Sequence, residues 1–340
     1  MEYGEVVRNI AAAVLKKGLV DGVLAFAQGS GASDIVPSFI TDEQDVAKIT
    51  IASYQPCSLA KLAAEYGKKG KRLAVVVRPC DARAIVELAK RKQLDLENLY
   101  LIGIECYGVA RQPQGEIYVF PQEILVDGEV RPLDEEILSP NCLRCEYPIP
   151  TMADVMWRIE KGIPSVTANT EKGRRILSAA EIESQGNPKT NTTSIKERAL
   201  KRQEKEFGEL KRMKPRDRLS YWLSQFDKCI KCYGCRNSCP ICYCEDCYLE
   251  PERLLVKREE YPPEKLFHVT RLIHMGDSCV NCGQCEAACP MGIPVSKLFH
   301  MMSKELGLLF KYEAGLDVNS LPPMSTIAEE DLAKGGVGLD

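Results

Sequence analysis

The stretch that decides the fold of this chain is residues 229–240, CIKCYGCRNSCP, and it is matched further along by residues 279–290, CVNCGQCEAACP. Both copies have the spacing C-x2-C-x2-C-x3-C-P, which is typical of bacterial proteins that carry two 4Fe–4S clusters. Three closely spaced thiolates bind one cluster from a single loop. The fourth, which follows one extra residue and precedes proline, reaches the other cluster.

This rule assigns the eight cysteines to two sets of four. One predicted set is Cys229, Cys232, Cys235 and Cys289, and the other is Cys279, Cys282, Cys285 and Cys239. Zinc sites pair separated C-x2-C units and are complete with four ligands, so two full copies favour iron–sulfur over zinc.

Composition narrows the class of protein. The 340 residues are 45% hydrophobic and 27% charged, with a formal net charge of -3, so we expect about two globular domains and no nucleic-acid partner. The first residues carry Glu2 and Glu5 and predict a helix ending at Gly18, not a signal peptide. No apolar run approaches the roughly 18 residues of a membrane span. We expect a cytoplasmic protein without membrane insertion, whose sixteen cysteines bind metal.

The N-terminal half alternates short apolar runs with helical patterns. Strands are predicted at 21–27, 48–54, 72–77 and 99–105, and helices at 58–70, 81–93 and 171–182. This alternation predicts an α/β domain with an open, mostly parallel sheet. A hairpin is expected around Asp127 and Gly128.

The change in composition along the chain predicts the domain boundaries. We expect an α/β domain over 1–182, a linker and charged helix over 183–226 with Ser194 as N-cap, an α+β dicluster ferredoxin-like domain with an insertion over 227–311, and a tail over 312–340. The charged helix is expected to present a solvated face.

Eight further cysteines lie outside the two runs. Cys57, Cys80 and Cys106 follow predicted strands, and the carboxyl ends of parallel strands face one crevice. Cys142 and Cys145 form a C-x2-C pair, for which a zinc knuckle or a redox dithiol are alternative interpretations. The last three, in the insertion, are Cys242, Cys244 and Cys247.

Three motifs of the N-terminal half resemble the beta-subunit family of coenzyme F420 hydrogenases and dehydrogenases, which includes formate dehydrogenase beta subunits. They are VVVRPCDARAIVELAK, LIGIEC and CLRCEYPIPTMADVMWRIEKG. The resemblance covers about half of the chain. It implies an α/β domain joined to a dicluster ferredoxin, and a third cluster bound by Cys80, Cys106, Cys142 and Cys145. The ferredoxin module usually precedes the α/β domain in this family, whereas here it follows.

The family often binds FAD. The nearest candidate for a flavin-binding turn in this chain is QGSGAS at 28–33, a short glycine-rich turn without a complete dinucleotide motif. A fourth cluster is a hypothesis that rests on the cysteine count alone. When the other twelve cysteines are assigned to three clusters, four remain: Cys57, Cys242, Cys244 and Cys247.

These observations predict an electron-transfer subunit of an oxidoreductase. The resemblance implies a hetero-oligomer with the catalytic subunit of a formate dehydrogenase or hydrogenase. A flavin-free relay in a heterodisulfide reductase-like complex and a stand-alone deazaflavin-dependent oxidoreductase are the alternatives. No catalytic side chain is predicted, since His268, His274 and His300 lie in predicted helices and no nucleophile or phosphate-binding motif is present.

Overall fold

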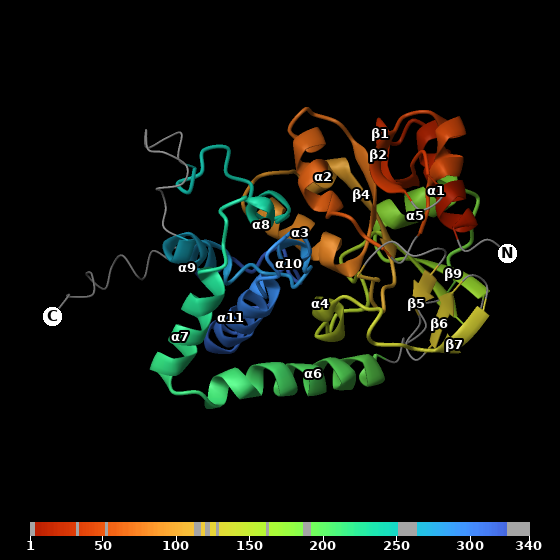
Figure 1. The fold of residues 1–340 in the computed structure, drawn as a ribbon. Helices are drawn as coiled ribbons and strands as arrows, with labels where there is room; N and C mark the ends of the chain where they lie inside the picture. Colours follow the sequence, from red (N-terminus) through yellow and green to blue (C-terminus); the bar gives the residue numbers. More distant parts are fainter. Residues whose placement is uncertain are drawn as a thin grey trace.

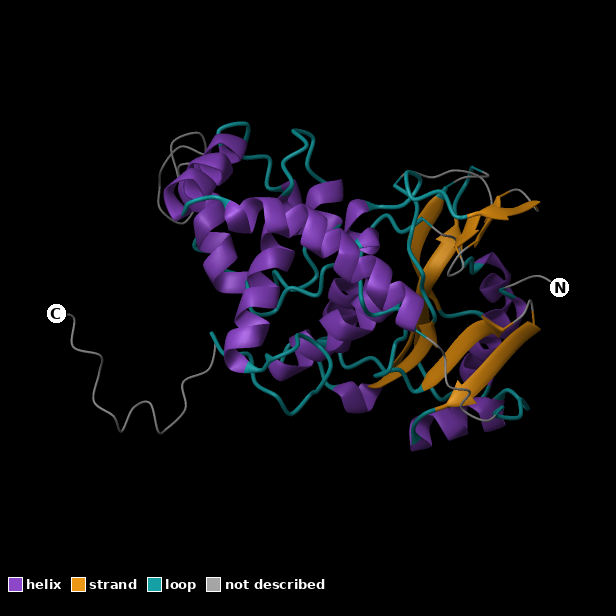
Figure 2. Ribbon diagram, turned by 90° about the horizontal axis from the view of Figure 1, so that it is seen from below, coloured by secondary structure: helices purple, strands orange, loops and turns teal. Residues whose placement is uncertain are grey.

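A six-stranded sheet forms one half of the molecule and a layer of helices the other, as the computed structural model shows (Figures 1 and 2). The structure describes residues 4–31, 34–51, 54–111, 117–119, 123–126, 129–160, 163–185, 192–250 and 264–324. None of the helices in these ranges has the length and apolar character needed to cross a membrane.

The sheet has the strand order β2-β1-β3-β4-β8-β9. Its strands are β1 (Gly22–Gln28), β2 (Ile35–Ile40), β3 (Leu73–Val77), β4 (Leu99–Ile104), β8 (Val155–Glu160) and β9 (Ile163–Ala168). The four central strands are parallel, and β2 and β9 close the two edges in antiparallel pairing. The prediction of a mostly parallel sheet is therefore confirmed.

Both faces of the sheet are covered. All five residues of β3, LAVVV, are buried, because Ala74 and Val76 face one layer while Leu73 and the remaining valines face the other. Helices α1 (Glu5–Lys16) and α5 (Glu171–Ala179) cover one face. Helices α2 (Leu59–Gly67) and α3 (Pro79–Lys90) cover the other.

One strand prediction differs from the structure, and several strands were not predicted. Residues 48–54 were predicted as a strand, but their described part makes only an isolated bridge between Ile49 and Ala27, since β2 already pairs along β1. The sequence analysis missed β2, whose Pro37 is tolerated at a sheet edge. It also missed the β8–β9 hairpin. The predicted turn residues Asp127 and Gly128 lie outside the described residues, between β6 and β7.

Short elements complete the N-terminal half. They are the 3-10 helices η1 (Glu43–Lys48) and η2 (Leu96–Asn98), the helix α4 (Pro140–Leu143), and a small sheet of β5 (Ile117–Val119), β6 (Glu123–Val126) and β7 (Glu129–Pro132).

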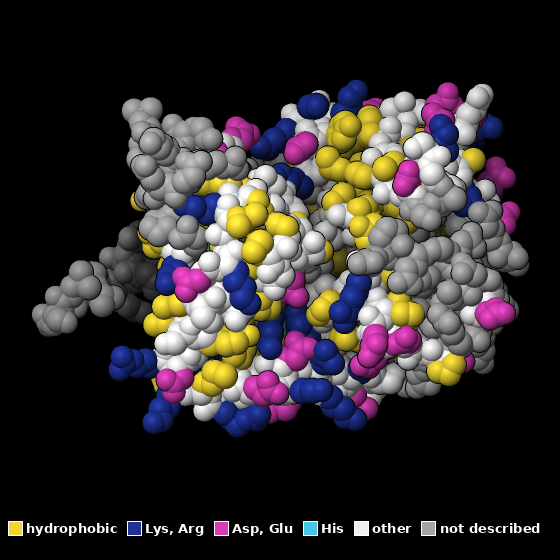
Figure 3. Space-filling view, viewed as in Figure 1, with side chains coloured by type: hydrophobic (Ala, Val, Ile, Leu, Met, Phe, Trp, Pro, Cys, Tyr) yellow, Lys and Arg dark blue, Asp and Glu magenta, His cyan; other side chains and the backbone are white. Residues whose placement is uncertain are grey.

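The described part of the second half is helical. It comprises α6 (Thr193–Arg212), α7 (Pro215–Phe226), α8 (Gly234–Asn237), α9 (Glu264–Met275), α10 (Gln284–Ala287) and α11 (Val295–Phe310). Ser194 lies inside α6, so it is not the N-cap that the sequence predicted. One face of α6 is buried through Ile195, Ala199 and Phe207, and charged side chains line its outer side along the lower edge of Figure 3.

The two halves share one hydrophobic core. Leu59 of α2 and Leu88 of α3 belong to the same buried cluster as Val280, Leu298 and Phe299 of the cysteine-rich half. The cysteine-rich half therefore packs directly against helices α2 and α3 of the α/β half. The predicted domain boundaries remain a sequence-based division of a chain whose core is continuous.

Candidate iron–sulfur centres

The two cysteine runs have the same backbone course. In each run the residues on either side of the second cysteine are left-handed: Lys231 (φ 52°) and Tyr233 (φ 60°) in the first, Asn281 (φ 57°) and Gly283 (φ 77°) in the second. Short helices α8 and α10 then follow at the same position. Left-handed residues curl the chain tightly, so successive cysteines lie around one loop.

The two loops pack directly against each other. The Ser238 hydroxyl contacts the Gly234 carbonyl at 2.8 Å and the Gln284 carbonyl at 3.1 Å. A Cβ at Gly234 would lie 2.8 Å from the Ala288 carbonyl oxygen. The thiol of Cys235 has Cys229, Cys289 and Cys232 as electrostatic neighbours, which are the other members of one predicted set.

The two runs differ in exposure. Cys232 of the first run is exposed, and the neighbouring Ile230 keeps 60% of its surface accessible. In the second run, burial raises the pKa of Cys279 and Cys285, and raises that of Cys282 to about 12. The first run therefore faces the outside, and the second faces the α/β half.

Arg271 of α9 supplies a buried positive charge to these loops. The side chain is 2% exposed, and its Nη2 donates to the Cys235 carbonyl at 3.0 Å and to Cys242 Sγ at 3.9 Å. Its Nε and Nη1 have no hydrogen-bond partner among the described residues. Burial alone would lower the pKa of Arg271, but thiolates at Cys242 and Cys235 raise it. A buried guanidinium with two donors still unused fits thiolate-bound clusters, which carry net negative charge.

A second group of thiols lines a cavity in the α/β half. Cys80 lies in the first turn of α3, Cys106 follows β4, and Cys142 and Cys145 lie in and after α4. All four line the same cavity, and Cys282 of the second run lines it too. Burial raises the pKa of Cys142 and of Cys145 to about 12. Arg78 Nη1 donates to Cys106 Sγ at 3.7 Å.

Comparison with known proteins adds the family. Residues 1–63 match the family described as coenzyme F420 hydrogenase/dehydrogenase, beta subunit N-terminal domain, and residues 225–293 match the 4Fe–4S dicluster domain. F420-dependent formate dehydrogenase subunit beta of Methanocaldococcus jannaschii is 35% identical over 96% of this chain and 95% of its own. The chain belongs to this family of beta subunits.

A second relative agrees with this family. Subunit beta of F420-dependent formate dehydrogenase 1 from Methanococcus maripaludis is 32% identical over 95% of this beta subunit and 93% of its own. A chain of the F420-reducing [NiFe] hydrogenase complex from Methanosarcina barkeri aligns with 60% of this chain and 85% of its own, at a TM-score of 0.46 and 15% identity. The family therefore rests on the sequence relatives, and the resemblance found in the motifs is confirmed.

Helix α3 of the beta subunit links the two groups of thiols. It carries Cys80 in its first turn, and one turn later Arg83 Nη1 donates to the Val280 carbonyl of the second run at 3.3 Å. Arg83 Nε also donates to the Ala314 carbonyl at 2.8 Å. A rigid helix thus holds the second run at a fixed place relative to Cys80.

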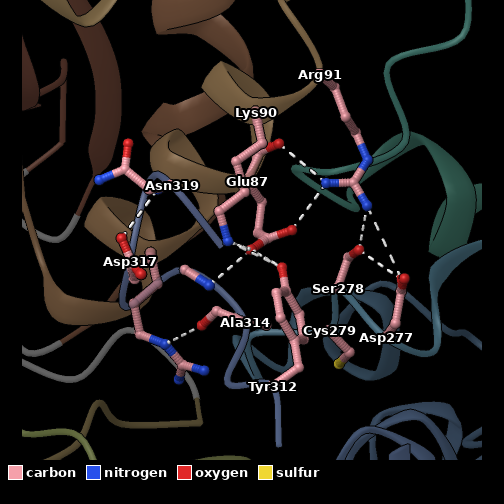
Figure 4. A network of polar contacts seen from close by, with 12 residues as sticks. Glu87, Lys90, Arg91, Asp277, Ser278, Cys279, Tyr312, Ala314, Asp317 and Asn319 are labelled. Carbon is pink, nitrogen blue, oxygen red and sulfur yellow. Dashed lines mark hydrogen bonds and ion pairs between the residues drawn. The ribbon is translucent and has the colours of Figure 1, made fainter. Parts of the chain in front are cut away.

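The far end of α3 adds a buried polar network (Figure 4). Glu87 Oε1 accepts from Tyr312 at 2.6 Å, from the Gly315 N–H at 2.7 Å and from Lys90 at 2.8 Å, while Oε2 accepts from Arg91 at 2.8 Å. The guanidinium of Arg91 also donates to the hydroxyl of Ser278, just before the second run. The sequence analysis missed this network, because Glu87 and Arg91 read as ordinary charges on an amphipathic helix and Tyr312 as part of a tail.

The α4 loop is braced by the second half as well. Arg144 forms an ion pair with Glu206 of α6 at 2.7 Å, and Gln203 Nε2 donates to the Arg144 carbonyl at 2.9 Å. Asn141 and Asn281 each donate a side-chain amide to the carbonyl of the other, at 3.2 and 2.9 Å. The loop that carries Cys142 and Cys145 is therefore fixed against both α6 and the second run.

The remaining cysteines divide between two places. Cys242, Cys244 and Cys247 line a separate cavity of about 270 Å³ together with Arg271. Cys57 does not line it. Burial, together with the neighbouring Asp81 carboxylate, raises the pKa of Cys57 to about 11. The structure thus gathers three of the four leftover cysteines and leaves Cys57 beside the first turn of α3.

No three cysteine, histidine or carboxylate side chains of the described residues converge closely enough to hold a single metal ion. This holds for the two ferredoxin-type runs as for the other thiols. A 4Fe–4S cluster is much larger than one ion, so its ligands stand further apart than those of a zinc site.

Proposed function

We propose that this chain is the electron-transferring beta subunit of an F420-dependent formate dehydrogenase. The activity comes from the names of two relatives that align with nearly the whole chain. The structural observation that carries the relay is that Cys282 of the second run lines the same cavity as Cys80, Cys106, Cys142 and Cys145. Electrons that reach the second run are thereby brought next to the α/β half.

Three clusters make up the relay. The first two are bound by the crossed sets of the two runs, and the third by the thiols of the α/β cavity, Cys80, Cys106, Cys142 and Cys145. When bound, each cluster supplies one-electron transfer. The chain supplies the ligands and a dry surrounding.

Several side chains and backbone groups are placed to adjust the reduction potentials of the clusters. The Lys231 N–H donates to Cys229 Sγ at 3.4 Å, and Arg78 donates to Cys106. Hydrogen bonds to ligand sulfur and nearby positive charge stabilise the more negative, reduced form of a cluster. Arg271 supplies that charge between the two runs. We expect its removal to lower the reduction potentials of both.

FAD does not fit the described part of the glycine-rich turn. The Gly31 N–H and the Ser30 hydroxyl both donate to the Asp34 carboxylate, at 2.9 and 3.4 Å. These donors are already used, and a carboxylate at this place repels a flavin phosphate. Residues 32 and 33 of the predicted turn lie outside the described residues. FAD stays a prediction from the sequence. The clusters carry single electrons, so a flavin bound elsewhere in the α/β half would supply the exchange between two single electrons and the hydride that F420 accepts.

The direction of the relay follows from exposure. The first run carries the exposed Cys232 and so forms the surface end, where a partner subunit exchanges electrons with it. We propose a formate-oxidising catalytic subunit as that partner and coenzyme F420 as the acceptor at the α/β end. A hydrogenase or heterodisulfide reductase-like partner and a cytoplasmic location stay predictions from the sequence.

The test uses the chain in complex with a formate dehydrogenase catalytic subunit, purified without oxygen. The three relay clusters should contribute about twelve irons and twelve sulfides per beta subunit, at four per cluster. Replacing Cys142→Ser should remove about four irons and abolish formate-dependent F420 reduction, while formate still reduces the two ferredoxin-type clusters. Unchanged iron content in this variant would refute the third cluster. A complex that fails to reduce F420 with all clusters present would refute the proposed acceptor.

A further inference from the structure

The cavity beside the insertion is the second concentration of thiols outside the two runs. It has a volume of about 270 Å³, and its lining combines Cys242, Cys244 and Cys247 with side chains of α9. The three thiols lie within six consecutive residues and line this one cavity together. The relay proposed above makes no use of this cavity.

The charge on the cavity wall favours an anionic occupant. Arg91 and Arg236 line it, but Arg91 is paired with Glu87 and Arg236 with Glu250. Arg271 also lines it and is 98% buried, with Nε and Nη1 lacking hydrogen-bond partners among the described residues. A buried guanidinium with two unused donors implies a compensating negative charge nearby.

The cavity is larger than a lone metal ion needs, at about 270 Å³ against the roughly 30 Å³ that one water molecule takes in the liquid. Three thiols spaced C-x-C-x2-C around such a volume match the ligands of a cluster. His274, in the last turn of α9, supplies a fourth ligand-type side chain on the wall.

We propose that this cavity holds a further 4Fe–4S cluster bound by Cys242, Cys244, Cys247 and His274. Each thiol loses its proton to solvent as it binds iron, and the imidazole binds in its neutral form. A cubane with three thiolates carries one negative charge fewer than a four-thiolate cluster, and Arg271 offsets the remaining charge. Cys57, the fourth cysteine suggested by arithmetic, is not a ligand.

The place of this cluster connects it to the relay. The Cys242 thiol is hydrogen-bonded to that of Cys239, a proposed ligand of the second ferredoxin-type cluster. The new cluster therefore lies within electron-transfer reach of that site, on a side branch next to the first run. This inference rests on the proposed function only in that clusters are inserted into the two runs.

Iron and sulfide content of the anaerobically purified complex tests the proposal without turnover. Wild type should contain about sixteen irons per beta subunit, and Cys247→Ser or Cys244→Ser should remove about four. The matched control is Cys57→Ser, which should leave the content unchanged. Equal iron in wild type and in both variants overturns the proposal. Loss of iron in Cys57→Ser overturns the histidine ligand in favour of Cys57.

A second experiment tests the histidine directly and separates this proposal from the relay. In His274→Ala the cluster keeps three thiolates, so mild oxidation should release one iron and give the EPR signal of a 3Fe–4S cluster, which wild type lacks. No such signal overturns the role of His274. If a cysteine variant fails to fold, native mass spectrometry of wild type still counts the clusters, and three clusters overturn the proposal. Iron content is independent of F420 reduction, so failure of the proposed acceptor leaves this result readable.

Discussion

The two cysteine runs have the same spacing and the same left-handed turns but opposite surroundings. At one position the first run has Tyr233 and the second has Gly283. The ring of Tyr233 packs against that of Phe267, with 5.3 Å between the ring centroids. Its hydroxyl donates to the Leu249 carbonyl at 3.1 Å. At Gly283 a Cβ would lie 2.1 Å from the Asn141 side chain of α4.

This difference separates the features of the runs that bind a cluster from those that fit each run to its surroundings. Four cysteines and a curled backbone recur in both runs because they wrap a cluster. The residues between them differ because one loop faces the insertion and the surface, whereas the other fits against α3 and α4. We expect equal losses of iron when either loop is damaged, but unequal losses of stability and electron transfer.

The largest effect is expected from Cys282→Ser compared with Cys232→Ser. Each should remove about four irons. Cys282→Ser breaks the link to the α/β thiols, so formate-dependent F420 reduction should fall more than about a hundredfold while the α/β half stays folded. Iron analysis, circular dichroism and turnover of the complex measure the three quantities.

The exposed Cys232 is the matched control. Cys232→Ser should lose as much iron, but the remaining second run should still be reduced by dithionite and still pass electrons to the α/β cavity. The two variants differ only in which half of the relay survives. Unchanged iron in Cys282→Ser would contradict the assignment of the second run.

A smaller effect on electron transfer and a large one on stability are expected from Glu87→Gln. The carboxylate is fully buried, and although burial raises its pKa, hydrogen bonds from Lys90 and Tyr312 lower it overall. The amide leaves the Lys90 ammonium without its buried ion-pair partner, which costs about 3–5 kcal/mol, whereas Arg91 keeps its ion pair with Asp277 at 3.9 Å. Thermal unfolding of the anaerobic protein measures this loss.

The exposed pair of Asp45 and Lys48 provides the control for Glu87. Asp45→Asn removes an ion pair of 2.7 Å between side chains that are more than half exposed, and should change stability by less than about 0.5 kcal/mol. An equally small effect of Glu87→Gln would show that the network does not anchor the second run.

The sequence predicted the repeated and local features well. The alternation of apolar runs and helical patterns predicted three of the four central strands and all four covering helices, because their buried faces show clearly in the sequence. The family came from short motifs in the right order. The edge strand β2, with Pro37, and the hairpin β8–β9 lack such a pattern, so they appear only when pairing partners are known.

The sequence marks the candidate ligands of the site but not the residues that support them. The regular spacing of the cysteines identifies them as candidate ligands in the sequence alone. No such pattern marks Arg83, Glu87 and Arg271, because their partners lie far away in the sequence. Arg83 contacts Val280, and Arg271 contacts Cys235. A buried charge is recognised only once the surrounding fold is known. The same reason explains why Cys57 was grouped with the insertion cysteines by arithmetic.

A sharper test of the loops compares Gly283→Ala with Gly292→Ala. Both glycines are left-handed, at φ +77° and +61°, so both lose about 1 kcal/mol from backbone strain. Only Gly283 meets a neighbour, and moving Asn141 breaks its exchange of hydrogen bonds with Asn281, which adds about 1–3 kcal/mol. Nothing lies within 4 Å of a Cβ at Gly292. Similar unfolding temperatures for the two variants would contradict the tight fit of the second run.

The smallest effect is a pH dependence that belongs to the first run's side of the molecule. His268 stacks on Phe226 at 4.6 Å, and neither ring nitrogen has a hydrogen-bond partner among the described residues. Burial, together with the charge of Arg271, lowers its pKa from 6.5 to about 4. Between these two values the unfolded chain binds a proton that the folded chain does not, so stability falls as the pH falls. The loss from this group is about 1 kcal/mol over the first pH unit below 6.5.

Phenylalanine keeps the stacking without a titrating group. His268→Phe should therefore match wild type at neutral pH and lose less stability in acid, with the remaining slope coming partly from His300, whose pKa burial also lowers. Unfolding temperatures measured at several pH values between about 7 and 5 make the comparison, and parallel curves for the two proteins would place the acid sensitivity elsewhere.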